Sequence, residues 1–231
     1  MRRLAAMLLL LGSCSRPQPQ PPAPPPKLVL WVWDRAEDLR FLKPGEAEVA
    51  ALMATIYLRN GRAETWHRKL PLHLPEGIEP ISVVRLESDG SPLPPPDSVQ
   101  SHLMLFSQRL LQLDFDFRAS QRDWYLELLG SIQSRDGGIS ITAVASACMD
   151  SPPAAGLVAE TVPMLFRMGP QRRAYLDRLQ KQGAFAAGCR DSLGLSIDEP
   201  LPWRPAAKRI YIFNPNRWSR ESFDQVRARL R

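Results

Sequence analysis

Eight short apolar runs recur between Lys27 and Phe213, and their regular spacing limits the folds that this chain can adopt. Each run is rich in β-branched or aromatic residues and is bounded by turn residues or by a stretch with helical periodicity. The runs are Leu28–Trp33, Val49–Leu58, Ile81–Glu87, Leu110–Phe117, Ile139–Ser146, Val162–Met168, Leu193–Asp198 and Arg209–Phe213. Because strands that alternate with helices usually pair in parallel through crossover connections, the pattern predicts an α/β fold.

Eight parallel strands in one domain of this size indicate a compact (β/α)8 barrel of the TIM type. Two connections depart from the ideal pattern, because Gly61–Gly77 alternates like a hairpin and the link after Ser146 is short and rich in proline. An irregular or open barrel is therefore the alternative. Helices are predicted to begin at three capping residues, Asp97, Ser120 and Ser219. A fourth helix is predicted over Gln171–Gln182.

The composition suits one sizeable core. The chain has 231 residues, of which 44% are hydrophobic, so residues 27–231 are predicted to form a single barrel domain. Its formal charge of +6 comes from scattered arginines and lysines, with no basic run interleaved with aromatic residues. We therefore do not expect nucleic acid as a partner, since nucleic-acid-binding proteins usually carry a clustered basic footprint.

The N-terminus carries a targeting pattern. Arg2 and Arg3 precede an apolar stretch over Leu4–Leu11, and Leu11-Gly12-Ser13-Cys14 ends it with small residues and a cysteine. This pattern resembles a bacterial lipoprotein signal, which implies that residues 1–13 are a signal peptide and that Cys14 receives an acyl chain such as palmitate. By the same resemblance, Ser15 favours the outer membrane and a periplasmic location. A plain secretory signal with an incidental cysteine is the alternative.

Proline and glutamine dominate the residues that follow Cys14. Residues 14–26 therefore form the predicted lipidated cysteine and an extended tether, because proline-rich segments adopt a stiff polyproline conformation. The apolar stretch before Cys14 is too short to span a bilayer, which takes about 20 residues. The membrane is thus an expected partner through a lipid only.

Two further cysteines, Cys148 and Cys189, lie within the predicted domain. In an exported protein such a pair can form a disulfide. Cys148 follows one predicted strand and Cys189 precedes another, which places them at opposite ends of the barrel. The sequence therefore predicts that they are not bonded.

The run at Leu110–Arg118 holds two carboxylates in an alternating pattern. In an extended strand Asp114 and Asp116 share one face, while Phe115 and Phe117 share the other. An unpaired carboxylate is costly to bury, so water, partner charges or chemistry must account for this face. Because active sites of such barrels lie at the C-terminal ends of the strands, Asp114 and Asp116 are the leading catalytic candidates.

Polar and aromatic residues at the other strand ends complete the candidate site. Glu87 and Asp198 are further catalytic candidates, although Arg85 on the same strand face suits Glu87 to a positioning role, and Asp198 can equally serve in a turn. Trp31 lies near the same rim. The predicted substrate-binding residues are Trp33, Arg59, Arg85, Arg118, Arg167, Glu199, Trp203 and Asn214.

Several other chemistries lack their sequence signatures. The chain has no glycine-rich dinucleotide fingerprint, Walker loop or Gly-x-Ser-x-Gly elbow, so no cofactor is predicted. His67, His73 and His102 have no metal-ligand spacing, and no metal is predicted. Cys148 has no nearby histidine to activate it as a nucleophile.

A family resemblance rests on ordered segments spread over Leu28–Trp218. The segments are Trp31–Leu39, Val83–Glu87, Leu113–Asp116 with Ser120–Asp123, Ile141–Ala143, Val162–Gly169, Gly194–Pro200 and Phe213–Pro215. Together they resemble the bacterial domain of unknown function 3142 family, a resemblance that implies a lipoprotein with a TIM-like barrel and no stated activity.

A second resemblance concerns the fourth predicted strand alone. Asp114-Phe115-Asp116-Phe117 is similar to the Asp-x-Asp-x-Glu strand end of chitinase-like glycoside hydrolases, but Arg118 stands where those enzymes carry their proton donor. Chitinase chemistry therefore does not carry over, and another acid, Glu87 or Asp198, would have to substitute.

These observations predict a lipid-anchored, carbohydrate-active hydrolase with a glycan ligand, since glycoside hydrolysis uses paired carboxylates. One alternative is a non-catalytic glycan-binding or envelope-assembly protein on the same barrel. Another is an anion site built from Arg59, Arg85, Arg118 and Arg167.

Overall fold

The computed structural model describes residues 25–106, 110–132 and 137–230. The predicted signal peptide, the predicted lipidation site Cys14 and the tether up to residue 24 lie outside these described residues. Within them, no helix has both the length and the apolar composition needed to cross a bilayer.

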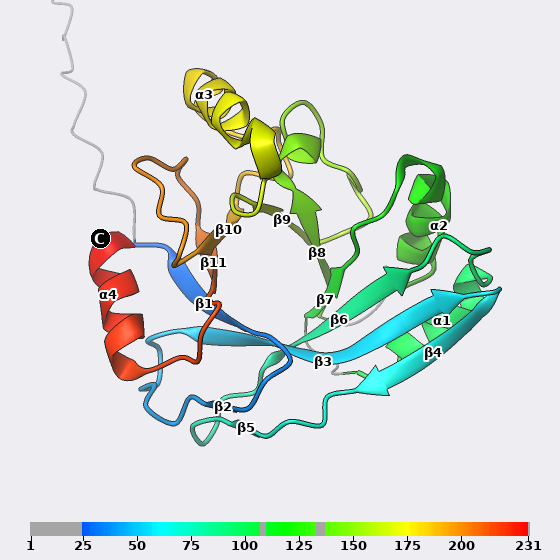
Figure 1. Ribbon diagram of the computed structural model, residues 1–231, viewed down its shortest axis with the longest axis horizontal. Helices are drawn as coiled ribbons and strands as arrows, with labels where there is room; N and C mark the ends of the chain where they lie inside the picture. Colours follow the sequence, from blue (N-terminus) through cyan, green and yellow to red (C-terminus); the bar gives the residue numbers. More distant parts are fainter. Residues whose placement is uncertain (1–24, 107–109, 133–136, 231) are drawn as a thin grey trace, which may run out of the picture.

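Eight parallel strands form a closed barrel (Figure 1). They are β1 (Lys27–Val32), β3 (Glu48–Arg59), β6 (Ile81–Ser88), β7 (Leu111–Asp114), β8 (Ile139–Val144), β9 (Glu160–Met164), β10 (Ser192–Ser196) and β11 (Arg209–Phe213). Neighbours in the chain are neighbours in the sheet from β3 to β11, and β1 pairs with both β3 and β11. The predicted parallel barrel is therefore confirmed, and it is compatible with a TIM-like fold.

Each barrel strand overlaps one of the eight predicted runs, but several strands end earlier than predicted. The run at Leu110–Phe117 was expected to be a strand throughout, whereas β7 stops at Asp114. Its last pairing joins Asp114 to Arg85 of β6, and beyond it the chain leaves the sheet. Asp116 therefore lies in a loop rather than in the sheet.

The helices are fewer than the strands. Those in the described chain are α1 (Pro96–Leu103), α2 (Arg122–Ile132), α3 (Arg172–Gln182) and α4 (Arg220–Leu230). A regular alternation of one helix with each strand is therefore not realised. The predicted cap of the last helix is confirmed, because the Ser219 hydroxyl accepts a hydrogen bond from the backbone N–H of Ser222 at 3.1 Å.

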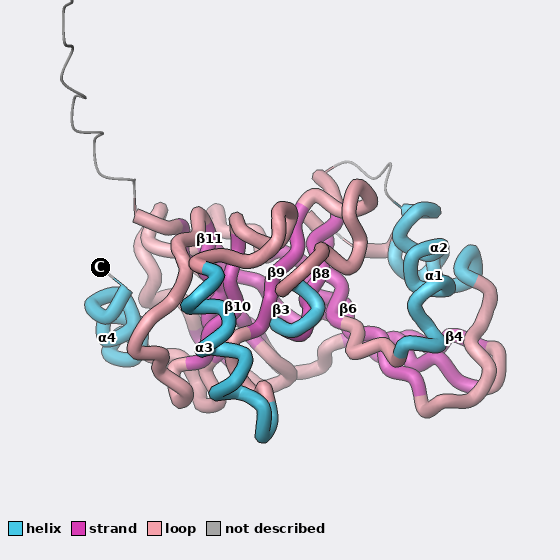
Figure 2. Tube along the Cα trace, turned by 90° about the horizontal axis from the view of Figure 1, so that it is seen from above, coloured by secondary structure: helices cyan, strands magenta, loops and turns pink. Residues whose placement is uncertain are grey.

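A β-hairpin replaces the helix after β3, as the alternation in Gly61–Gly77 predicted. The strand β4 (Arg62–His67) pairs antiparallel with the outer end of β3. Asn60 and Gly61 form the turn with φ of 48° and 71°, and two positive φ angles suit a tight hairpin because they match the twist of the strands. This ribbon extends away from the barrel and is covered by α1 and α2 (Figure 2).

Apolar contacts attach the helices to the outer face of the barrel. Leu128 and Leu129 of α2 pack against β7 and β8, and Phe223 and Val226 of α4 pack against β1 and β11. Leu179 of α3 joins a third cluster beside β9 and β10. Burying these faces is the main stabilising contribution expected for a barrel of this kind.

The inside of the barrel is apolar in its middle and polar at the N-terminal ends of the strands. Glu160, the first residue of β9, accepts hydrogen bonds from Ser140 (2.7 Å), Ser192 (2.5 Å) and Tyr211 (2.6 Å). Arg209 lies 3.6 Å from the same carboxylate. Burial and the negative charge of Glu160 raise the pKa of Tyr211, so its hydroxyl stays protonated and donates.

Cys148 and Cys189 form a disulfide, which overturns the prediction that they are not bonded. Their Cα atoms are 5.9 Å apart, and both residues are buried in the cluster with Leu179 and Phe185. Cys148 does follow β8 and Cys189 does precede β10, but the segment before Cys189 lies beside Cys148. The Cys148 carbonyl accepts a hydrogen bond from Ala186 at 3.0 Å, which brings the two ends together.

We expect the disulfide to stabilise the fold by about 2–4 kcal/mol, because it closes a long loop in the unfolded chain. Urea unfolding of the oxidised chain, the reduced chain and the variant Cys148→Ala/Cys189→Ala measures this difference. Reduction should lower the unfolding free energy of the natural chain and leave that of the double variant unchanged. Free thiols at both positions in the folded protein would contradict the bond.

Candidate functional site

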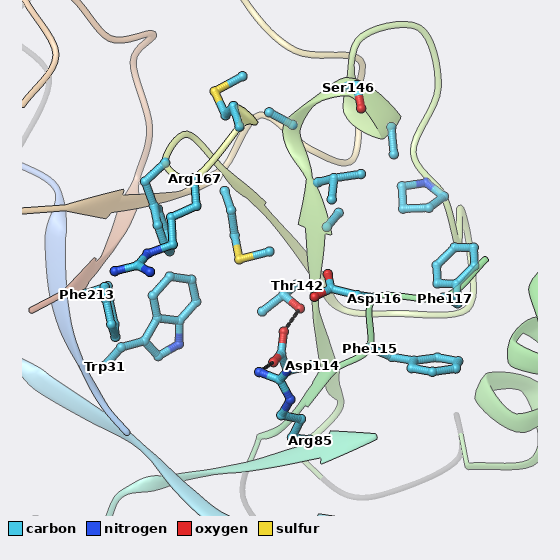
Figure 3. Close-up of a pocket in the computed structure, with 18 of the residues that line it drawn as sticks. Trp31, Arg85, Asp114, Phe115, Asp116, Phe117, Thr142, Ser146, Arg167 and Phe213 are labelled. Carbon is cyan, nitrogen blue, oxygen red and sulfur yellow. Dashed lines mark hydrogen bonds and ion pairs between the residues drawn. The ribbon is translucent and has the colours of Figure 1, made fainter. Parts of the chain in front are cut away.

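A pocket of about 870 Å³ opens at the C-terminal ends of the barrel strands (Figure 3). Its walls come from at least six strands or the loops that follow them, including residues far apart in the sequence. They include Trp31, Trp33, Arg85, Asp114, Asp116, Thr142, Met164, Phe166, Arg167, Tyr175 and Phe213. Of the predicted site residues, the structure thus brings together Trp33, Arg85, Asp114, Asp116 and Arg167.

Asp114 lies at the base of the pocket, where β7 ends. Its side chain is 8% exposed, accepts a hydrogen bond from the Thr142 hydroxyl at 2.6 Å and lies 3.6 Å from a guanidinium nitrogen of Arg85. Burial raises the pKa of Asp114 above its usual range, and the negative charge of Asp116 acts in the same direction. Thr142 and Arg85 oppose this shift without cancelling it.

Asp116 occupies the loop beyond Asp114 and is exposed. Figure 3 shows its carboxylate directed toward Thr142 and the inside of the pocket. The alternation predicted for this segment persists outside the sheet, because Phe115 and Phe117 turn onto Tyr125 of α2, with ring centroids 5.2 and 5.1 Å away. The two rings anchor the loop that carries Asp116.

Aromatic rings form the wall opposite the acids. Phe166 and Phe213 stack with centroids 5.6 Å apart, and Trp31 meets the edge of Phe166 at 6.2 Å. The Trp31 indole donates a hydrogen bond to the Gln112 side chain at 2.6 Å, which holds the ring in place. Such faces can pack against the apolar faces of sugar rings.

Phe166, Phe213, Thr142 and Tyr175 are pocket residues that the sequence analysis did not select. Strand alternation is a signal for two of them, since Phe213 follows the inward-facing Tyr211 by two positions and Thr142 follows the inward-facing Ser140. No such signal exists for Tyr175, which reaches the pocket from α3.

Arg85 and Arg167 bring positive charge to the pocket. The Arg85 guanidinium lies 2.8 Å from Glu87 and 5.7 Å from the centre of the Trp33 ring. Arg85 and Glu87, expected on the same strand face, are thus in direct contact. The Arg167 guanidinium lies over the ring of Phe213, 5.4 Å from its centroid.

Two candidate acids lie outside the pocket lining. Glu87 is engaged with Arg85 beyond the rim, and Asp198 is exposed and accepts a hydrogen bond from the hydroxyl of Ser196. Asp198 was expected at the end of a strand, but β10 ends at Ser196 and the chain turns there. Neither residue therefore completes an acid pair with Asp114.

The remaining predicted residues also lie away from the lining, for separate reasons. Arg59 covers the ring of Tyr57 on the β3–β4 hairpin, and Arg118 precedes α2 beside Gly90. Trp203 packs in the cluster around the disulfide. Asn214 is buried and caps its own turn, accepting a hydrogen bond from the N–H of Asn216 at 2.8 Å.

Glu199 acts behind the pocket rather than in it. Its carboxylate accepts the backbone N–H of Arg167, with oxygens at 3.1 and 3.2 Å, and lies 3.6 Å from Arg172. The structure thus gives Glu199 a positioning role toward the loop of Arg167. Within the described ranges no group of three or more histidine, cysteine, aspartate or glutamate side chains is arranged to hold a metal ion.

The raised pKa of Asp114 predicts that Asp114→Asn gains stability relative to the natural chain as pH rises. Below about pH 3.9 the Asp114 carboxyl is protonated in both the folded and the unfolded chain and makes no difference. Between that pH and the higher folded-state pKa, the folded chain keeps a proton that the unfolded chain has released, so the unfolding free energy of the natural chain falls. Urea unfolding at a series of pH values should show that the difference in unfolding free energy between Asp114→Asn and the natural chain widens as pH rises and then levels off.

Thr142→Val provides the matched comparison, because it removes the hydrogen bond that opposes the shift. In the Thr142→Val variant, the pH range over which the Asp114 carboxyl lowers the unfolding free energy should extend to higher pH. A difference between Asp114→Asn and the natural chain that does not change with pH would contradict the raised pKa.

Gly194 allows Trp31 to lie across the barrel. A Cβ at position 194 would come within 2.8 Å of the indole, so Gly194→Ala should displace Trp31 and cost about 1–3 kcal/mol of unfolding free energy. Tryptophan fluorescence and urea unfolding measure the two effects. Gly130→Ala in α2 is the control, since that site has no atom within 4 Å and alanine favours a helix. An unchanged stability of Gly194→Ala would show that the close contact is not maintained.

The site therefore combines a buried acid, an exposed acid, an aromatic wall and two arginines at one end of a parallel barrel. Searches with this chain found no match among models of protein families, among curated proteins or among solved structures.

Proposed function

We propose that this TIM-like barrel is a carbohydrate-active hydrolase that uses Asp114 and Asp116. The observation that carries the proposal is the presence of both carboxyl groups in one pocket whose opposite wall is aromatic. Hydrolysis of a glycosidic bond requires one carboxyl group that protonates the leaving oxygen and a second that acts as nucleophile or base. The pocket supplies two groups of this kind.

The environments of the two acids suit different roles. Asp114 is buried and its pKa is raised, which favours the protonated form that a general acid needs. Asp116 is exposed on the loop and can act on a water molecule or on the sugar directly. Asp114 thereby takes the role for which the sequence analysis considered Glu87 or Asp198, neither of which lines the pocket.

The lipoprotein-like N-terminus leads us to propose a cellular location for the protein as well. With Cys14 acylated and residues 15–26 as a spacer, the barrel would face the periplasm from a lipid anchor, with the outer membrane favoured by Ser15. The resemblance to the domain of unknown function 3142 family is consistent with this location and adds no activity.

One observation favours a second function, non-catalytic glycan binding or envelope assembly. Asp114 is held by Thr142 and lies close to Arg85, which itself contacts Glu87. A carboxyl group tied into such a network can serve to position Arg85 for a ligand instead of transferring a proton. The two functions share the pocket and differ in turnover.

Turnover of envelope and exopolysaccharide fragments by the full chain distinguishes them. We expect Asp114→Asn and Asp116→Asn each to lower kcat by about 100-fold to 10,000-fold, because each removes one partner of the acid pair. Reducing-end release measures turnover, and circular dichroism checks that each variant is folded.

Asp198→Asn is the control variant, since it removes a carboxylate outside the pocket lining. It should retain most of the turnover. Binding of fragments without turnover by the natural chain would replace the hydrolase with the binding function.

A further inference from the structure

Of the two arginines that line the pocket, Arg167 is the one whose guanidinium is not paired with a carboxylate in the described residues. Arg85 is engaged by Glu87 and Asp114, at 2.8 and 3.6 Å. The Arg167 guanidinium, by contrast, has no hydrogen bond or ion pair with any residue in the described part of the chain, and it packs on the ring of Phe213. Figure 3 shows this guanidinium beside Phe213, on the other side of the pocket from Asp114 and Asp116.

The backbone at Arg167 is held in an unfavourable conformation. Its φ is 52°, in the left-handed region, which residues other than glycine seldom adopt and which costs free energy. The carboxylate of Glu199 accepts the Arg167 N–H and thereby holds this turn. Strain of this kind persists only where the surrounding structure enforces it, and here the side chain that it positions lines the pocket and stays exposed to a ligand.

Aromatic packing sets the orientation of the guanidinium. Phe213 lies beneath it, and Phe213 is itself fixed by its parallel stack with Phe166 at an interplanar angle of 5°. An arginine packed on a ring keeps the donors at the edge of its planar fork available. This fork matches the two oxygens of a carboxylate, which it can bind through two parallel hydrogen bonds.

We infer that Arg167 binds the carboxylate of an acidic sugar, so that the pocket selects glycans containing uronate residues. This inference rests on the proposed carbohydrate function. The sugar ring would lie beside Trp31 and Phe166, because Phe213 is covered by Arg167 and Phe166. Repulsion from Asp116 would keep the sugar carboxylate at the Arg167 end. The overall charge of +6 favours the approach of an acidic glycan.

Calorimetric binding to matched pairs of oligosaccharides tests the inference. The probes are oligogalacturonate, oligomannuronate and a hyaluronan tetrasaccharide, each beside its carboxyl-reduced counterpart, at low salt. The full chain should bind at least one acidic oligosaccharide about 10-fold more tightly than the reduced form, as expected for hydrogen bonds to a charged group.

Arg167→Asn should remove this preference, and asparagine tolerates the left-handed conformation, so the turn is retained. Arg173→Asn is the matched control, because Arg173 is an exposed arginine on the neighbouring helix α3 outside the pocket lining and its loss changes the net charge equally. That variant should keep the preference.

Three results would overturn the inference: no acidic oligosaccharide preferred over its reduced form, a preference that survives Arg167→Asn, or an equal loss in Arg173→Asn. Hydrolysis is followed separately in the same samples. If acidic oligosaccharides bind more tightly through Arg167 but are not hydrolysed, only the hydrolase proposal is contradicted. If reduced oligosaccharides are hydrolysed and acidic ones do not bind more tightly, only the inference of an acidic ligand is contradicted.

Discussion

The pairing of β1 with β3 closes the barrel, and the remaining structure depends on this closure. A closed sheet has no edge at which an inward side chain can turn to solvent, so every second residue of eight strands faces a shared interior. Apolar residues such as Val29, Val83 and Val162 fill its middle. Polar groups gather toward the two ends, although the buried Gln112 pairs in register with Val83. The C-terminal end widens into a pocket.

Polar groups inside the barrel are linked rather than isolated. Glu160 at the N-terminal end binds Ser140, Ser140 accepts a hydrogen bond from Gln112 at 3.1 Å, and Gln112 accepts the indole N–H of Trp31. These hydrogen bonds give the side chains of Glu160, Ser140, Gln112 and Trp31 polar partners inside the barrel, which avoids the cost of leaving them unpaired. The same chain fixes Trp31 beneath the pocket, so a network that stabilises the interior also shapes the site.

Much of the fold could be predicted from local pattern. The eight apolar runs predicted the strands and their parallel order, and the alternation in Gly61–Gly77 predicted the hairpin, because strand periodicity and turn residues act over a few neighbours. The Cys148–Cys189 bond could not be derived in this way. It depends on how the segment around Ala186 folds back onto Cys148, and sequence separation does not specify that path.

The candidate site likewise has features that local sequence pattern predicts and features that depend on the tertiary structure. The sequence by itself determined that Asp114 lies at the C-terminal end of a barrel strand, with Asp116 two positions further on, whereas the expected continuation of the strand through Asp116 was wrong. Only the tertiary structure decided that Asp114 is buried beside Thr142 while Asp116 stays exposed, and that Arg167 enters the pocket whereas Arg59 and Arg118 do not. Burial, pKa and pocket membership depend on which distant strands surround a residue, and that arrangement exists only once the barrel has closed.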